Sequence, residues 1–110
     1  METRRDIFQA IADPTRRAIL TLLAFQAMTP GAIASNFDSK RQTISKHIQI
    51  LTECELVGQQ QKGREIYYHI NPHKINEIDA WVAQFKTILE MQFSQLDHIL
   101  LHQKKHHHGK

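Results

Sequence analysis

The chain has 110 residues, of which 41% are hydrophobic and 23% charged, and its formal net charge is +3. This length predicts one globular domain, 1–105, with a modest core that gains from dimerisation, followed by a flexible His/Lys tail, 106–110. No apolar run is long enough to span a bilayer and no signal-peptide pattern opens the chain, so we expect a cytoplasmic protein. The single cysteine, Cys54, excludes an internal disulfide and a cysteine-pair metal site within one chain.

The first third of the chain predicts two helices with a break between them. Apolar residues at helical spacing in residues 4–12 predict a short helix. Asp13 and Pro14 then mark a new start, because aspartate caps a first turn and proline fits the first helical position. The helix that follows is strongly apolar, and we expect it to belong to the core.

The same pair of signals, a capping residue followed by proline, predicts a third, brief helix. Thr29 is the candidate cap and Pro30 the first helical residue, and Ile33 and Phe37 supply its apolar positions. Residues 36–39 then predict a tight turn, which leads into the most informative segment of the chain.

A helix over residues 40–53 is predicted next. Ser39 is a candidate N-cap, and Gln42, three residues later, completes a possible capping box. Apolar residues recur at spacings of four and three along one face: Ile44, Ile48 and Leu51. The other face should therefore meet solvent or a ligand.

That other face is rich in hydrogen-bond donors, and residues 39–49 contain no acidic residue. It carries Lys40, Arg41, Gln42, Thr43, Ser45 and Lys46. Such side chains reach phosphates and base edges. An ordinary solvated surface helix is the alternative reading, but a short helix and a tight turn directly before this one favour a helix-turn-helix.

Residues 57–70 predict a β-hairpin with a basic tip. Residues 65–70 alternate in character, and Gly63 supplies a turn between two extended runs. Lys62 and Arg64 flank that glycine. A hairpin of this kind directly after a recognition-type helix is typical of the wing of a winged helix.

The remainder of the chain predicts one long helix, from about residue 73 to 103. Its apolar stripe continues for roughly eight turns, more than a domain of this size needs to cover its own core. We therefore expect the stripe to contact a partner subunit, chiefly through Ile78, Trp81, Phe85, Ile88 and Leu89. Trp81 and Phe85 could instead line a ligand pocket, although aromatic residues at helical spacing are more often dimer core.

The order of these elements resembles the ArsR-type winged-helix repressors, over roughly residues 3–90. The segments Asp-Pro-Thr-Arg-Arg (13–17) and Ser-Lys-His-Ile (45–48) carry the resemblance, together with the Gly63-Arg64 wing and Tyr68. The closest match is to the autorepressor-like branch that lacks the thiol metal site. The resemblance implies a mainly α winged helix-turn-helix with a small β-hairpin, dimeric through its terminal helices and without a cofactor. It also implies a homodimer that binds a palindromic double-stranded operator and represses transcription, commonly of its own operon.

The resemblance also assigns roles to individual positions. DNA-facing residues of the family align with Arg41, Gln42, Thr43, Ser45, Lys46 and His47, and its wing contacts align with Lys62 and Arg64. Arg41 and Gln42 lie nearest the helix start, where an inserted helix meets base edges, so they are the expected readers of sequence. His47 lies beside the apolar stripe. A packed, hydrogen-bonded structural role for this histidine is therefore at least as well supported as a contact to a base.

The chain departs from the family pattern at two places. The family often ends the recognition helix in Ala-Gly, whereas this chain has Cys54-Glu55, so the end of this helix is expected to differ if glycine is required. The preceding short helix has no cysteine, which argues against sensing of arsenic, cadmium or lead there.

Other functions remain as alternatives. His98 and His102 are four residues apart, a workable spacing for a transition metal, and would make the protein a metal-responsive repressor. A winged helix serving protein–protein assembly is a second alternative, and a redox role for Cys54 has little support because a lone thiol is usually a small buried hydrophobe. No nucleophile elbow, phosphate-binding glycine loop or acid–base pair is present, so an enzyme is not expected. The sequence identifies no inducer.

Overall fold

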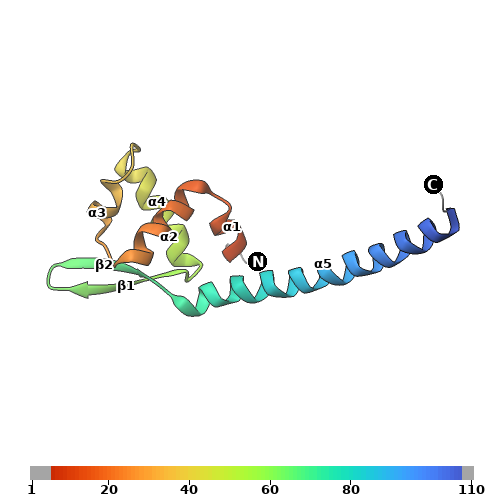
Figure 1. The fold of residues 1–110 in the computed structure, drawn as a ribbon. Helices are drawn as coiled ribbons and strands as arrows, with labels where there is room; N and C mark the ends of the chain where they lie inside the picture. Colours follow the sequence, from red (N-terminus) through yellow and green to blue (C-terminus); the bar gives the residue numbers. More distant parts are fainter. Residues whose placement is uncertain (1–5, 108–110) are drawn as a thin grey trace, which may run out of the picture. The chain divides into compact units, whose positions relative to one another are not determined.

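The computed structural model describes the main chain of residues 6–107 and the side chains of residues 6–96. Its elements follow in the order α1 (Ile7–Ile11), α2 (Pro14–Phe25), α3 (Pro30–Ala34), α4 (Arg41–Glu53), β1 (Val57–Lys62), β2 (Glu65–Ile70) and α5 (Pro72–His107) (Figure 1). The mainly helical class with one small hairpin is thus confirmed. Over the residues described, no helix is both long and apolar enough to cross a membrane.

Two of the three predicted helix starts are confirmed. The carboxylate of Asp13 accepts a hydrogen bond from the backbone N–H of Arg16 at 3.0 Å. The hydroxyl of Thr29 accepts one from Ala32 at 3.2 Å. In each case proline occupies the first turn, where its missing N–H costs nothing.

The predicted capping box at the start of α4 is wrong. Lys40 is the N-cap, its side chain makes no capping hydrogen bond, and Ser39 lies in the bend before it. The carbonyl of Lys40 accepts from the backbone N–H groups of Thr43 and Ile44 at 3.0 and 3.2 Å, so the helix begins one residue later than a Ser39 cap requires. The first turn of α4 is therefore not covered by a side-chain cap.

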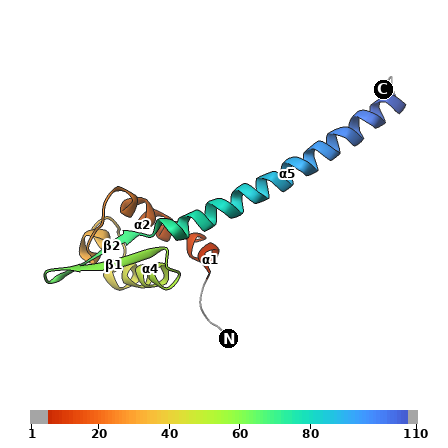
Figure 2. The ribbon, with the colours of Figure 1, turned by 90° about the horizontal axis from the view of Figure 1, so that it is seen from below.

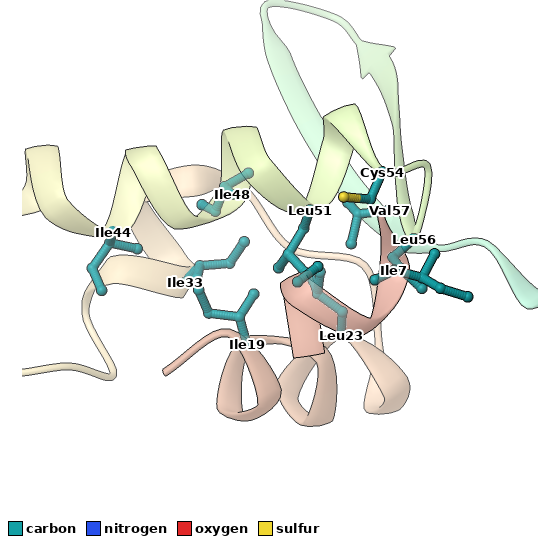
Figure 3. Close-up of a cluster of buried hydrophobic side chains, with 11 residues drawn as sticks. Ile7, Ile19, Leu23, Ile33, Ile44, Ile48, Leu51, Cys54, Leu56 and Val57 are labelled. Atoms are coloured by element: carbon teal, nitrogen blue, oxygen red, sulfur yellow. The ribbon is translucent and has the colours of Figure 1, made fainter. Parts of the chain in front are cut away.

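The core lies where α4 crosses α2 and α3. Ile44, Ile48 and Leu51 point from α4 toward the side chains of the other two helices (Figure 3). Their partners there are Ile19, Leu23 and Ile33, all at most 4% exposed. This burial holds one face of α4 inward and leaves the opposite face outward.

The end of α4 keeps the left-handed geometry although it lacks a glycine. Glu55 has a φ of 64°, and its backbone N–H donates to Thr52 at 3.0 Å while that of Leu56 donates to Leu51 at 3.1 Å. This is the Schellman pattern, and Leu51 and Leu56 are both fully buried. The expectation of a different helix end is therefore wrong. Asn71 supports the corner by donating to the Glu55 carbonyl at 2.8 Å.

The hairpin is attached to the helices through β2. Tyr68 exchanges two backbone hydrogen bonds with Met28, at 2.8 and 3.0 Å, in the segment between α2 and α3. The antiparallel register runs from Val57 opposite Ile70 to Lys62 opposite Glu65. The tip of the hairpin projects away from the helices in both views (Figure 1, Figure 2).

The chain divides into two compact units, Met1–Ile78 and Asp79–Lys110, and the boundary lies within α5. In the first unit, Ile75 and Ile78 from the start of α5 pack against the core. The helix extends to His107, so His106 and His107 of the expected tail lie within it, and residues 108–110 lie outside the described part.

Candidate nucleic-acid interface

The predicted recognition residues of α4 lie on its exposed face. Every donor-bearing position expected there is exposed, namely Lys40, Arg41, Gln42, Thr43, Ser45 and Lys46. The apolar residues Ile44 and Ile48 of the same helix face inward and are only 1% and 3% exposed. The helix therefore presents two cationic turns without an intervening acid, a surface suited to a polyanion.

The start of α4 adds the positive end of a helix dipole to these charges. Its first turn has no side-chain cap, and Lys40 and Arg41 stand at that turn. Backbone N–H groups at a helix start, combined with the dipole, favour phosphate oxygens. The charges and the dipole thus converge on the same end of the helix.

Arg41 lies against α3 as well as at the start of α4. A Cβ atom placed on Gly31, in the first turn of α3, would lie 3.4 Å from Nη2 of Arg41 and 3.8 Å from its Cζ. These are van der Waals distances, so the guanidinium lies directly beside the first turn of α3. The helix-turn-helix thus presents Arg41 at the junction of its two helices.

The wing presents its two cations at a tight two-residue turn. Lys62 pairs with Glu65 across the strands, which leaves Gly63 and Arg64 as the loop. Gly63 has a φ of 64° and Arg64 does not have a positive φ, as in a type II′ hairpin turn. Lys62 and Arg64 are both exposed, as the sequence predicted.

Two side-chain contacts in the wing were not predicted from the sequence. Nζ of Lys62 lies 5.7 Å from the ring centroid of Tyr67, within the range of a cation–π contact. The amide of Gln61 donates to the carbonyl of Gly63 at 3.2 Å. The hairpin register would have placed Lys62 and Tyr67 as diagonal neighbours on one face, and that signal could have identified Tyr67.

His47 differs from its neighbours on α4 because its ring reaches α2. Nδ1 lies 3.2 Å from Nη1 of Arg16 and 3.9 Å from Oδ2 of Asp13, and the side chain is 18% exposed. The backbone N–H of Arg16 lowers the pKa of Asp13, partial burial opposes this, and the nearby charges of His47 and Arg16 lower it further. In the sequence, Arg16 is part of the family motif and Asp13 is a predicted helix cap. The sequence did not predict that either residue lies near His47.

The residues expected at a dimer interface divide between the two units. Trp81, Phe85 and Ile88 are 43–49% exposed on α5, and the rings of Trp81 and Phe85 stack with centroids 5.1 Å apart. Leu89 is half-buried, and Ile78 packs on the core of its own chain.

The side chains of the metal candidates His98 and His102 lie outside the described residues. Among the side chains that are described, no three His, Cys, Asp or Glu residues gather to hold a metal ion.

These elements define a winged helix-turn-helix DNA-binding protein. They are the short helix α3, the helix α4 with one buried and one cationic face, and the hairpin with a basic tip. A family model described as a helix-turn-helix domain matches residues 11–59. The chain is 40% identical over 80 residues to the transcriptional repressor SdpR of Bacillus subtilis, a match that covers 73% of this chain and 89% of that protein. The chain belongs to the ArsR family of winged-helix transcriptional regulators.

Solved structures agree with this assignment. An ArsR-like transcriptional regulator from Rhodococcus superposes with a TM-score of 0.74 at 28% identity, over 84% of this chain and 88% of that one. The homodimeric winged helix-turn-helix domain of a possible ArsR-family regulator from Mycobacterium bovis superposes with a TM-score of 0.59 at 29% identity, over 73% of this chain and 74% of that one.

Proposed function

We propose that this protein is a homodimeric repressor of its own operon that binds a palindromic operator through helix 40–53 and the wing 57–70. The exposed cationic face of the first turns of α4, where residues 41–49 include no acid, is the observation that carries the proposal. The relative SdpR is named as a repressor, and the Mycobacterium bovis domain as homodimeric. Residues 1–105 serve as one DNA-binding and dimerisation domain, which acts on DNA in the cytoplasm without a catalytic step or a cofactor.

The roles of the individual residues follow from their reach and position. Arg41 and Gln42, at the start of α4, read base edges in the major groove. Thr43 and Ser45 are shorter and meet phosphates or a thymine methyl group, and Lys46 contacts a phosphate. Lys62 and Arg64 contact the backbone or the minor groove from the wing.

The subunits pair through the second unit of the chain in this proposal. Phe85 and Ile88 supply exposed apolar surface on α5, and Trp81 and Leu89 continue the same stripe. A stripe of this kind is stable in water when a second copy covers it. Two linked recognition helices then match the two half-sites of a palindrome.

Selection of bound fragments from a genomic library, followed by footprinting, tests the proposal. We expect a bound palindrome upstream of the gene for this chain and an affinity that falls steeply with salt, because phosphate contacts release counterions. An absence of binding at low salt would refute DNA recognition and support a protein–protein assembly module instead. Zinc or nickel that changed operator affinity after removal of the tail would show a metal-responsive repressor.

A further inference from the structure

Arg16 links three helices of the first unit through one guanidinium. Its Nε donates to the carbonyl of Ala10 at 2.7 Å and its Nη2 to that of Gln9 at 3.1 Å, both in α1. Its Nη1 lies 3.2 Å from Nδ1 of His47 on α4. The orientation of the His47 ring is therefore held from α2 and, through Arg16, from α1.

This contact decides which ring nitrogen carries the proton. A guanidinium has only donors, so Nδ1 of His47 must accept and the proton of the neutral ring must sit on Nε2. The carboxylate of Asp13 would favour the opposite tautomer by accepting from Nδ1, but its Oδ2 is 3.9 Å away, beyond hydrogen-bond range. That same oxygen already accepts from the backbone N–H of Arg16 at 3.0 Å.

We propose that Arg16 is a positioning residue for DNA binding, which holds His47 as the Nε2–H tautomer so that the ring offers an N–H donor to DNA. This inference rests on the proposed function. His47 follows exposed Thr43 by one helical turn and is adjacent to exposed Lys46. With Nδ1 occupied by Arg16, Nε2 is the remaining polar atom of the ring, and an N–H there suits a phosphate oxygen or a base acceptor.

Nitrogen-15 NMR of the imidazole in the free protein tests the first half of the proposal. We expect the wild type to show the Nε2–H tautomer and Arg16→Lys to show a mixture, because lysine cannot reach both α1 and His47 with a planar fork. Arg17→Lys is the matched control, since Arg17 also donates to an α1 carbonyl, that of Ile11 at 2.8 Å. A wild-type ring protonated on Nδ1, or an Arg16→Lys spectrum equal to that of wild type, overturns the proposal.

DNA affinity tests the second half, with a duplex recovered from a random library by the wild-type protein as the probe. We expect Arg16→Lys to bind about tenfold more weakly, the loss of one well-placed hydrogen bond, and Arg17→Lys to bind as wild type does. His47→Ala should weaken binding similarly, and Arg16→Lys should add nothing in that background.

If the losses of DNA affinity in Arg16→Lys and His47→Ala add up in the double variant, Arg16 acts through the fold and not through His47. That result overturns the proposal. If the wild type recovers no duplex, the proposed function fails. The tautomer measurement still decides the Arg16–His47 link in that case, because it needs no DNA.

Discussion

At the scale of single residues, Arg41 and Lys46 occupy different positions on one exposed face. Arg41 lies at the first turn of α4, against Gly31 of α3, whereas Lys46 lies more than one turn further along the helix. At the start of a helix inserted in the major groove, a guanidinium can make a bidentate hydrogen bond to guanine, whereas an ammonium acts as a point charge. We therefore assign sequence preference to Arg41 and phosphate attraction to Lys46.

Arg41→Ala and Lys46→Ala should separate these two roles. Arg41→Ala should relax sequence preference and cost about 1–3 kcal/mol of specific binding if the contact to guanine is bidentate. Lys46→Ala should weaken specific and non-specific binding equally and lower the salt slope by about 1. Binding isotherms over a range of salt, with Lys86→Ala on α5 as the matched loss of charge, measure both effects. An unchanged preferred sequence in Arg41→Ala would reassign the base reader.

Glu55 is the residue that carries backbone strain at the end of α4. Its φ of 64° is the left-handed region, where a Cβ atom crowds the following carbonyl. The position is kept because Leu56 is fully buried and Asn71 hydrogen bonds the Glu55 carbonyl at 2.8 Å. The surrounding contacts thus enforce a conformation that the residue itself disfavours.

Glu55→Gly should stabilise the protein by about 1 kcal/mol, because glycine adopts this conformation without the crowding. The expected rise in Tm is roughly 5 °C, measured by thermal denaturation. Glu55→Ala is the control, since it removes the carboxylate and retains the strain, and it should be close to neutral. A rise in Tm for alanine equal to that for glycine would attribute the effect to charge.

At the scale of elements, the wing depends on the two ends of its hairpin. The paired bonds between Tyr68 and Met28 attach β2 to the helices, while Gly63 turns the tip. A Cβ atom on Gly63 would meet nothing within 4 Å, so a larger residue there is opposed by the backbone conformation alone. The tip can therefore be weakened without disturbing the core.

Gly63→Ala should destabilise the tip of the wing by about 1 kcal/mol and weaken DNA binding without changing the preferred sequence, because α4 is untouched. Amide hydrogen exchange of β1 and β2 measures the first effect, and binding to the selected duplex measures the second. Gly63→Asn is the matched variant, since asparagine tolerates a positive φ better than alanine does. Equal losses for both substitutions would contradict a conformational cause.

At the scale of the whole molecule, α5 is longer than the first unit requires. Its early residues Ile75 and Ile78 pack on that unit, and beyond them most large apolar side chains, though not Leu89, are 40–59% exposed. Such a continuous apolar stripe marks an interaction surface. In our proposal a second copy covers it and thereby pairs two recognition helices.

Phe85→Glu should convert the dimer into a monomer, because it places a charge in the centre of the stripe. Sedimentation measures the change. Affinity for the palindrome should fall by at least about 100-fold, since two linked half-site contacts become independent. Thr87→Glu is the control because Thr87 is exposed on α5 and lies away from the stripe. A Phe85→Glu variant that remained dimeric would place the interface elsewhere.

The sequence by itself determined the features that depend on neighbours a few residues apart. The caps at Asp13 and Thr29 and the apolar stripe of α4 were predicted correctly, because capping bonds and helical periodicity act within one or two turns. The turn at Gly63 is local in the same way, and with it the basic tip of the wing.

Only the tertiary structure decided the features that join distant segments. It brought Asn71 onto the carbonyl of the left-handed Glu55, and it brought Arg16 to His47, 31 residues away in sequence. Local patterns permit several outcomes at each of these places. Which one occurs depends on side chains that meet only when the helices pack, so no rule based on neighbouring residues could select it.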